Sequence, residues 1–230
     1  MFLACHLIAG IVIGIIIARA CGDRRAIPAC ALGALIPDIV DKPLGHIFLA
    51  ESLGYGRIYL HTLLFLVIVL AIGALIFWRS RNVLVLAAGA GIASHQVLDA
   101  MWREPTNWYY PFLGPFSGSG DTTSFMDLVI SEISAPSEWL LLVATAIFCL
   151  FLFYRGESII GGRALERILP PLGILLILVG IWTAGAGVLD ITAPLTGWES
   201  AEDNILCGAV IALSGCAALF FRTNGSGTNP

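Results

Sequence analysis

Charged side chains are scarce in this sequence. Only 12% of the 230 residues are Asp, Glu, Lys or Arg, whereas 58% are hydrophobic, and the mean hydropathy is +0.89. A water-soluble domain needs a surface of mixed charged residues, so this composition excludes one. Apolar runs suited to spanning helices occur at about residues 2–20, 58–78, 82–100, 137–154, 169–189 and 204–221. The sequence therefore predicts an integral membrane protein.

Paired cysteine motifs are also absent. No two of the six cysteines have Cys-x-x-Cys spacing, and most lie inside or at the ends of apolar runs: Cys5, Cys21, Cys30, Cys149, Cys207 and Cys216. We expect small buried hydrophobic residues here rather than disulfides or a zinc knuckle.

Two of the apolar runs leave alternatives open. The run from Ala26 to Pro37 is short, so it is either a crossing or a re-entrant helix, which must be covered by protein or line a wet cavity. The first run ends at Ala18-Arg19-Ala20, as a cleaved signal peptide would. A signal peptide begins with basic residues, however, and residues 2–5 contain none. We expect the first run to remain as a membrane helix.

Arginine is distributed unevenly across the predicted crossings. If the chain crosses the bilayer at every run, including residues 26–37, nine arginines fall on one side: Arg19, Arg24, Arg25, Arg79, Arg81, Arg155, Arg163, Arg167 and Arg222. Only Lys42, Arg57 and Arg103 fall on the other side, with most of the acidic residues. An excess of arginine marks the cytoplasmic side, which puts the N-terminus outside and the C-terminus in the cytoplasm. The predicted fold is all-α, a polytopic transmembrane helical bundle of about seven membrane segments in the cytoplasmic membrane, one of them short.

We expect three regions along the chain. Residues 1–136 form a metal-site membrane domain, residues 137–222 a three-helix membrane scaffold, and residues 223–230 a disordered tail. A long outer loop at 101–136 is rich in aromatic residues, which suit either an interfacial belt or a lid over a site. Glycines in the scaffold predict close helix contacts, namely Gly180, Gly185, Gly187, Gly208 and Gly215.

Residues able to bind a metal gather at one end of the predicted helices. They are His6, Asp38, Asp41, His61, His95 and Asp99, and His46 lies in the loop between. Ionisable groups at the edge of a bilayer core are usually paired, solvated or metal-bound. Since independent structural roles would scatter the histidines, their clustering in the first 95 residues favours a site at the non-cytoplasmic face.

Two local patterns give this site its chemistry. His95 and Asp99 are four residues apart, which stacks them on one helix face, and imidazole with carboxylate suits Zn²⁺ or a similar divalent ion. The alternative is an ordinary hydrogen-bonded histidine. Arg57 lies one turn outward from His61. It is either an interfacial arginine or a phosphate ligand, because its planar fork matches phosphate oxygens.

The order of several short motifs resembles the YdjM-type family of membrane-bound, metal-dependent hydrolases. The matching residues cover about residues 1–116: His6, Ile36-Pro37-Asp38 with Asp41, Arg57 to Thr62, Ser94-His95 to Asp99, and Tyr110-Pro111-Phe112. That family is distantly similar to zinc-dependent phospholipase C and P1 nuclease, helical phosphodiesterases with clustered zinc ions. The resemblance implies that His61, His95, Asp99 and one of the aspartates are metal ligands.

Two departures from that pattern affect the expected site. The family's acids stand as Asp-x-Asp followed by His, whereas this chain has Asp38-Ile-Val-Asp41-Lys42. Asp41 is therefore expected either to orient a water molecule or to complete the coordination. No histidine follows His95, so the further His-x-x-x-Glu of the phospholipases is absent and a full trinuclear site is not expected.

These patterns together predict a metal-dependent hydrolase of phosphoester bonds, with membrane lipid and a lipid or lipid-linked substrate at the outer face as partners, and no nucleic acid. The expected ligands of a divalent metal, zinc, are His6, Asp38, His61, His95 and Asp99, and the expected catalytic residues are Arg57 and Asp41. The alternative is a non-enzymatic protein, either a metal or proton transporter or a metal-stabilised structural protein. A transporter would carry ionisable groups through the depth of the membrane, whereas these cluster at one face.

Overall fold

A computed structural model describes residues 3–118, 125–134, 138, 139, 142, 145, 146, 162–191 and 201–223. All regular secondary structure in these ranges is helical, which confirms the predicted all-α class. The chain divides into two compact units. One comprises Ala9–Ser134, and the other joins Leu3–Ile8 to the described residues after 134. The predicted domain boundaries at residues 136 and 222 stay predictions.

Several described helices have the length and composition of membrane helices. Three are long and apolar enough to cross a bilayer: α1 (Leu3–Cys21), α3 (Leu63–Ser80) and Pro170–Val188 within α8 (Gly162–Val188). Two apolar helices are shorter: α4 (Leu84–Leu98) and Asn204–Cys216 within α9 (Ala201–Thr223). Six large apolar side chains of α3 are exposed, as on a helix that faces lipid. The predicted segment at 137–154 lies mostly outside the described residues, so the number of about seven crossings stays a prediction.

The second helix is longer than the apolar run that predicts it. α2 (Ala26–Pro43) continues through Pro37 and is followed by a short π-helix, η1 (Leu44–Phe48). The helix therefore extends beyond the apolar run that predicts it. Proline removes one backbone donor, but a helix packed among neighbours keeps its remaining hydrogen bonds. Asp38 and Asp41 lie within the last turns of α2, at the helix end where the sequence predicts them.

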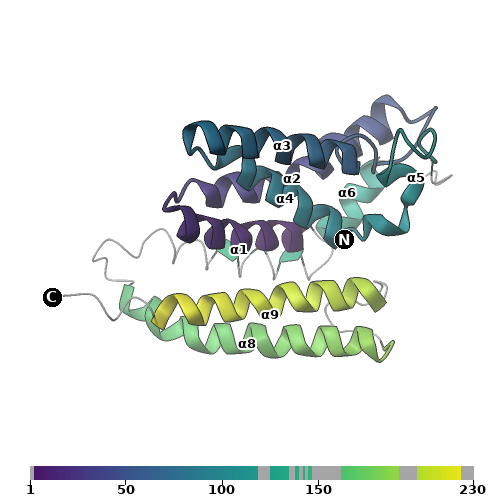
Figure 1. Cartoon of the computed structure of the whole chain (residues 1–230). Coiled ribbons are helices and arrows are strands. Elements are labelled where there is room, and N and C mark those ends of the chain that lie inside the picture. Colours follow the sequence, from purple (N-terminus) through teal and green to yellow (C-terminus); the bar gives the residue numbers. More distant parts are fainter. Residues whose placement is uncertain are drawn as a thin grey trace. The chain divides into compact units, whose positions relative to one another are not determined.

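Glycines allow α2 and α4 to pack with their backbones in contact. A Cβ atom on Gly33 of α2 would lie 2.1 Å from the carbonyl oxygen of Ala88, and one on Gly91 of α4 would lie 2.1 Å from the carbonyl oxygen of Cys30. Only glycine permits such an approach. The two helices consequently lie side by side (Figure 1).

The chain direction brings three helix ends together. Cys30 lies against Gly91, and one turn further along both helices Ala34 lies against His95, so α2 and α4 run in the same direction. α3 leads into α4 through a tight turn at Arg81, whose φ is 57°, and packs against it. The C-terminal ends of α2 and α4 therefore meet the start of α3.

Part of the predicted outer loop is helical. Residues 101–134 include η2 (Met101–Arg103), α5 (Pro105–Trp108) and α6 (Phe125–Ser134). The side chain of Asn107 fixes the intervening segment, because its Nδ2 donates to the carbonyl oxygen of Ser117 at 3.2 Å and its Oδ1 accepts from the Ser117 N–H at 2.8 Å.

The other unit contains α8 and α9, which pack closely (Figure 1). A Cβ atom on Gly180 would lie 2.4 Å from the backbone nitrogen of Ala212, and one on Gly208 would lie 2.4 Å from that of Ala184. The predicted close contacts are confirmed at Gly180, Gly187, Gly208 and Gly215. The prediction is wrong at Gly185, where a Cβ atom would meet nothing within 4 Å. Thr223 belongs to α9, and the rest of the predicted tail lies outside the described residues.

Candidate metal centre

Four buried side chains converge where the three helix ends meet. They are Asp38, His61, His95 and Asp99, and one ligand atom from each lies within 4.8 Å of the others. Both histidines are 0% exposed, and the aspartates are 4% and 7% exposed. The structure thus brings together four of the five residues predicted as metal ligands. The fifth, His6, is buried in the part of α1 that belongs to the other unit.

The imidazole rings of His61 and His95 face each other through their Nε2 atoms. Nε2 of His61 lies 3.0 Å from Nε2 of His95. On the far side of each ring, Nδ1 of His95 lies 2.7 Å from the carbonyl oxygen of Ala34, and Nδ1 of His61 lies 2.8 Å from Oδ2 of Asp41. Since those oxygens only accept, both Nδ1 atoms carry the proton in the neutral rings. Each Nε2 atom then carries an unprotonated lone pair, and the two lone pairs attract a cation placed between them.

Two carboxylates flank this pair of nitrogens. Oδ1 of Asp38 lies 3.6 Å from Nε2 of His61 and 3.7 Å from Nε2 of His95. Oδ2 of Asp99 lies 3.7 and 3.8 Å from the same two atoms. Among the described residues, no group donates a hydrogen bond to the buried Oδ1 of Asp38. A buried anionic oxygen without a donor is costly unless a cation neutralises it.

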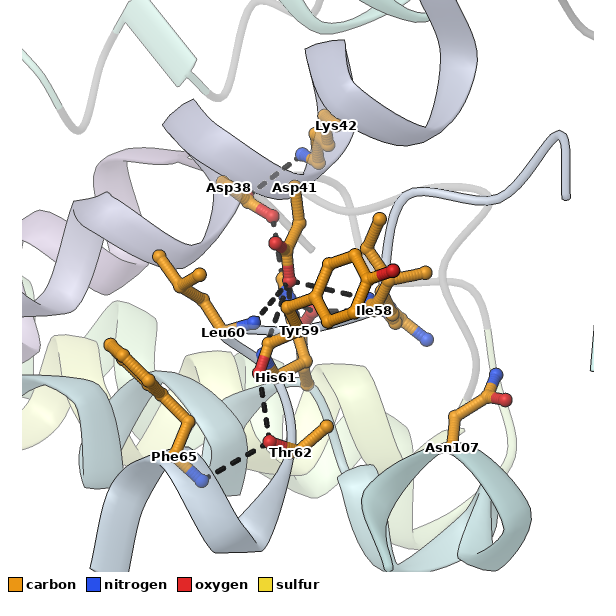
Figure 2. A network of polar contacts seen from close by, with 12 residues as sticks. Asp38, Asp41, Lys42, Ile58, Tyr59, Leu60, His61, Thr62, Phe65 and Asn107 are labelled. Carbon is orange, nitrogen blue, oxygen red and sulfur yellow. Dashed lines mark hydrogen bonds and ion pairs between the residues drawn. The ribbon is translucent and has the colours of Figure 1, made fainter. Parts of the chain in front are cut away.

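Asp41 holds the segment that carries His61. Its Oδ2 accepts from the backbone N–H groups of Ile58 at 3.2 Å, Leu60 at 2.8 Å and His61 at 3.1 Å, in addition to the His61 ring (Figure 2). Thr62 then caps α3 by accepting from the Phe65 N–H at 3.1 Å. Asp41 is fully buried and lies outside the group of four. Its contacts are those of a carboxylate that orients a metal-binding histidine.

Each flanking carboxylate is paired with a cation at the border of the site. Lys42 Nζ lies 2.8 Å from Oδ2 of Asp38, one helical turn away on α2 (Figure 2). Arg57 donates from Nε to Oδ2 of Asp99 at 3.0 Å. The side chains of Lys42 and Arg57 are 28% and 32% exposed, so they separate the buried aspartates from the surroundings.

Arg57 is held in turn by Glu104, which follows α4. Its Nη1 donates to Oε1 of Glu104 at 2.7 Å, and the Tyr55 hydroxyl donates to Oε2 of the same carboxylate. Burial and this hydrogen bond raise the pKa of Tyr55, which keeps the phenol protonated and donating. The guanidinium is therefore fixed between one cluster aspartate and one outer glutamate.

The formal charges of this network do not cancel. Among the described residues, its contacts link four carboxylates, those of Asp38, Asp41, Asp99 and Glu104, with two cations, Lys42 and Arg57. With neutral imidazoles, two negative charges remain. One divalent ion would balance them, and two nitrogens with two carboxylate oxygens suit Zn²⁺ or a similar metal. The residues present therefore fit a single divalent cation.

A proton is the competing cation. Burial lowers the pKa of His61, but the carboxylates of Asp38, Asp41 and Asp99 outweigh burial and raise it to about 10. Without a metal, His61 is then protonated at neutral pH, and its Nε2 donates to Nε2 of His95 across the 3.0 Å separation.

Gln96 also supports the segment that carries His61, and it was not identified from the sequence. Its Nε2 donates to the carbonyl oxygens of Leu60 and Thr62 at 3.3 and 3.1 Å, and its Oε1 accepts from Trp108 Nε1 at 2.9 Å. The sequence offers no signal for it beyond its place beside His95. Tyr55 and Glu104 were missed as well, because both lie in segments without helical periodicity. Lys42 did have a signal, since it follows Asp38 by four residues.

Comparison with known proteins identifies the family. A family model described as YdjM inner membrane protein matches residues 1–160. No curated protein and no solved structure matches the chain. The match spans all four residues of the candidate metal centre and their supporting contacts, and it agrees with the resemblance carried by the motifs. The apolar helices and this match make the chain a membrane protein, and it belongs to the YdjM inner membrane protein family.

Proposed function

We propose that the protein is a membrane-bound, metal-dependent hydrolase of phosphoester bonds in a lipid or lipid-linked substrate. The observation that carries this proposal is the 3.0 Å approach of two Nε2 lone pairs, flanked by the carboxylates of Asp38 and Asp99. The four residues would hold one divalent ion, which we propose to be zinc. When bound, such an ion lowers the pKa of a water molecule and polarises a phosphoryl oxygen.

Arg57 is the proposed phosphate ligand. Its Nε and Nη1 are engaged by Asp99 and Glu104, whereas Nη2 takes part in neither bond. Nη2 can therefore donate to a phosphate oxygen while Asp99 keeps its position, and developing negative charge on the phosphate would be stabilised. Asp41 serves the proposed reaction indirectly, because it sets the tautomer and the orientation of His61.

We further propose that the site works at the outer face of the cytoplasmic membrane, with the N-terminus outside and the C-terminus in the cytoplasm. The arginine distribution supports this orientation. Phe48 and Phe112, which follow α2 and α5, are 77% and 76% exposed and would suit contact with lipid. The net charge of −4 offers nothing to attract nucleic acid.

A metal-stabilised structural protein is the second candidate, and one observation favours it. The group already offers four protein ligands, all buried. Structural zinc sites are closed by four protein ligands, whereas catalytic ones keep a position for water. Under this alternative, the ion would only join the ends of α2 and α4 to the start of α3.

Metal content and hydrolysis, measured on the same samples, test both candidates. The purified protein should contain one divalent ion per chain by elemental analysis and should hydrolyse a chromogenic phosphodiester in liposomes. His95→Ala should lose metal and activity together, because it removes a ligand nitrogen. Arg57→Lys should keep the metal and lose activity, because lysine keeps the charge but not the planar fork. His46→Ala is the matched control and should keep both.

Three outcomes would change the assignment. Full metal occupancy in His95→Ala would show that the ligand set is wrong. Metal loss in His6→Ala would bring His6, expected as a ligand from the sequence, into the site. A metal-loaded protein that hydrolyses none of a series of phosphomonoesters and phosphodiesters would favour the structural candidate.

A further inference from the structure

Two cysteines far apart in the sequence meet in the unit formed by the start of α1 and the described residues after 134. Sγ of Cys5 lies 3.4 Å from Sγ of Cys207 of α9. The two side chains are 0% and 1% exposed, and both are free thiols in this structure. The other described cysteines are Cys21, Cys30 and Cys216, and no sulfur–sulfur contact joins them.

Both thiols lie in the first two turns of their helix. Cys5 is the third residue of α1 and Cys207 is the seventh of α9. The beginning of α1 is also fixed by a contact outside the helix, since the Ala4 N–H donates to Oε2 of Glu138 at 3.0 Å. The approach of the two sulfurs is thus set by packed helix ends rather than by loops.

We propose that Cys5 and Cys207 are oxidised to a disulfide that joins the first helix to the last. This proposal rests on the orientation proposed above, in which both helices begin at the outer face. Disulfides form and persist on that side of a cytoplasmic membrane, whereas the cytoplasm keeps thiols reduced. A disulfide has an S–S distance of about 2.05 Å, so the sulfurs need to approach by only about 1.3 Å.

The chemistry requires an oxidant, which we take to be a thiol–disulfide oxidoreductase carrying its own disulfide. One cysteine thiolate attacks that disulfide and forms a mixed disulfide, and the second thiolate attacks the mixed disulfide and releases the oxidoreductase. Two electrons and, in net terms, two protons pass to the oxidoreductase, which leaves as a dithiol. Because both side chains are buried in the packed unit, the exchange takes place before α1 settles against α9.

The bond would close a loop that contains nearly the whole chain. Cross-links that close long loops restrict the unfolded chain most, although measured gains correlate weakly with loop length. It would also fix the start of α1 against α9. This inference concerns the second unit and does not depend on the hydrolase proposal.

Mass spectrometry tests the proposal on protein that is expressed in bacteria with an oxidising periplasm. The protein is isolated without reductant, denatured and alkylated with N-ethylmaleimide. Cys21, Cys30 and Cys216 should all be alkylated, whereas a cross-linked peptide pair containing Cys5 and Cys207 should appear and should separate on reduction. Cys5→Ser should make Cys207 fully alkylatable, and Cys207→Ser should do the same for Cys5. Cys30→Ser, another buried thiol, is the matched control and should leave the cross-link intact.

Full alkylation of Cys5 and Cys207 in the unreduced protein would overturn the proposal. A cross-link between other cysteines would overturn it as well. Neither result would alter the metal content or the hydrolysis measured for the site of Asp38, His61, His95 and Asp99, so failure of this inference is distinguishable from failure of the proposed function.

Discussion

His61 and His95 face each other through their Nε2 atoms at 3.0 Å, while Asp41 and the carbonyl oxygen of Ala34 occupy the opposite sides of the two rings. This arrangement leaves one position between the rings for a cation. A proton and a divalent metal therefore compete for the same place, and pH should control the outcome.

Metal affinity should rise with pH. The pKa of His61 is raised from 6.5 to about 10, so the folded, metal-free protein keeps a proton on His61 throughout the neutral range, and metal binding must release it. The affinity should increase up to about tenfold per pH unit until pH approaches the folded pKa. Competition with a chelator at about pH 6 and about pH 8 measures this slope. An affinity independent of pH would show that His61 binds no proton in the metal-free protein.

The same raised pKa stabilises the metal-free protein below neutrality. A group with a raised folded pKa contributes its full stability below the unfolded value, near 6.5, and loses it as pH rises through about 10. The metal-free protein should therefore become less heat-resistant in detergent between these limits. His61→Gln should flatten that dependence.

Asp41→Asn should weaken metal binding without removing a ligand. The substitution keeps the shape of the side chain but removes the charge that accepts from the His61 ring and from three backbone N–H groups. Loss of such an orienting carboxylate typically costs about 10–100-fold in metal affinity. Isothermal titration with zinc measures the change. Asp127→Asn, at an exposed acid of α6, is the control and should bind as the unmodified protein does.

Gly91→Ala should disturb both packing and the metal site. Its new Cβ atom would lie 2.1 Å from the carbonyl oxygen of Cys30, so α4 must move away from α2 and carry His95 with it. Overpacking of this kind costs about 1–3 kcal/mol. Resistance to denaturant in detergent should fall, and metal affinity should fall with it. Gly185→Ala is the matched control, because a Cβ atom there meets nothing within 4 Å.

Leu113→Cys should be labelled from outside the cell. Residue 113 is 57% exposed and follows α5, on the side where the proposed orientation puts the metal site. Gly118 is less suitable, because a Cβ atom there would lie 2.5 Å from the carbonyl oxygen of Leu53. A membrane-impermeant maleimide should label the variant in intact cells, and a reporter fused after Arg222 should give a cytoplasmic signal. Labelling of Leu113→Cys only after lysis would reverse the orientation.

The helices and the gathering of their polar ends follow from simple sequence patterns. Apolar runs predict α1, α3 and α4 to within a few residues. Because α3 runs opposite to α2 and α4, alternation alone brings Asp38, His61 and His95 to one end. Spacings of four residues add Asp99 beside His95 and Arg57 beside His61, although they do not reveal which residues support them.

The supporting contacts could not be predicted, because they depend on irregular backbone. Asp41 accepts from three backbone N–H groups of the segment at residues 58–61, and Glu104 accepts from Arg57 in the segment after α4. Neither segment has a period that fixes the direction of its side chains. The apolar run alone does not reveal how far α2 continues past Pro37, because proline is usually a stop signal and the packed neighbours make it tolerable here.

The bond between Nδ1 of His95 and the carbonyl oxygen of Ala34 makes the metal site sensitive to helix register. A slip of one residue between α2 and α4 moves their atoms by about 1.5 Å along the axis, which is enough to break this 2.7 Å bond and to withdraw His95 from Asp38. Only chains whose helices are docked in the correct register would then retain the ion. Metal occupancy would thereby distinguish chains in which α2 and α4 pack in the correct register from chains in which they do not.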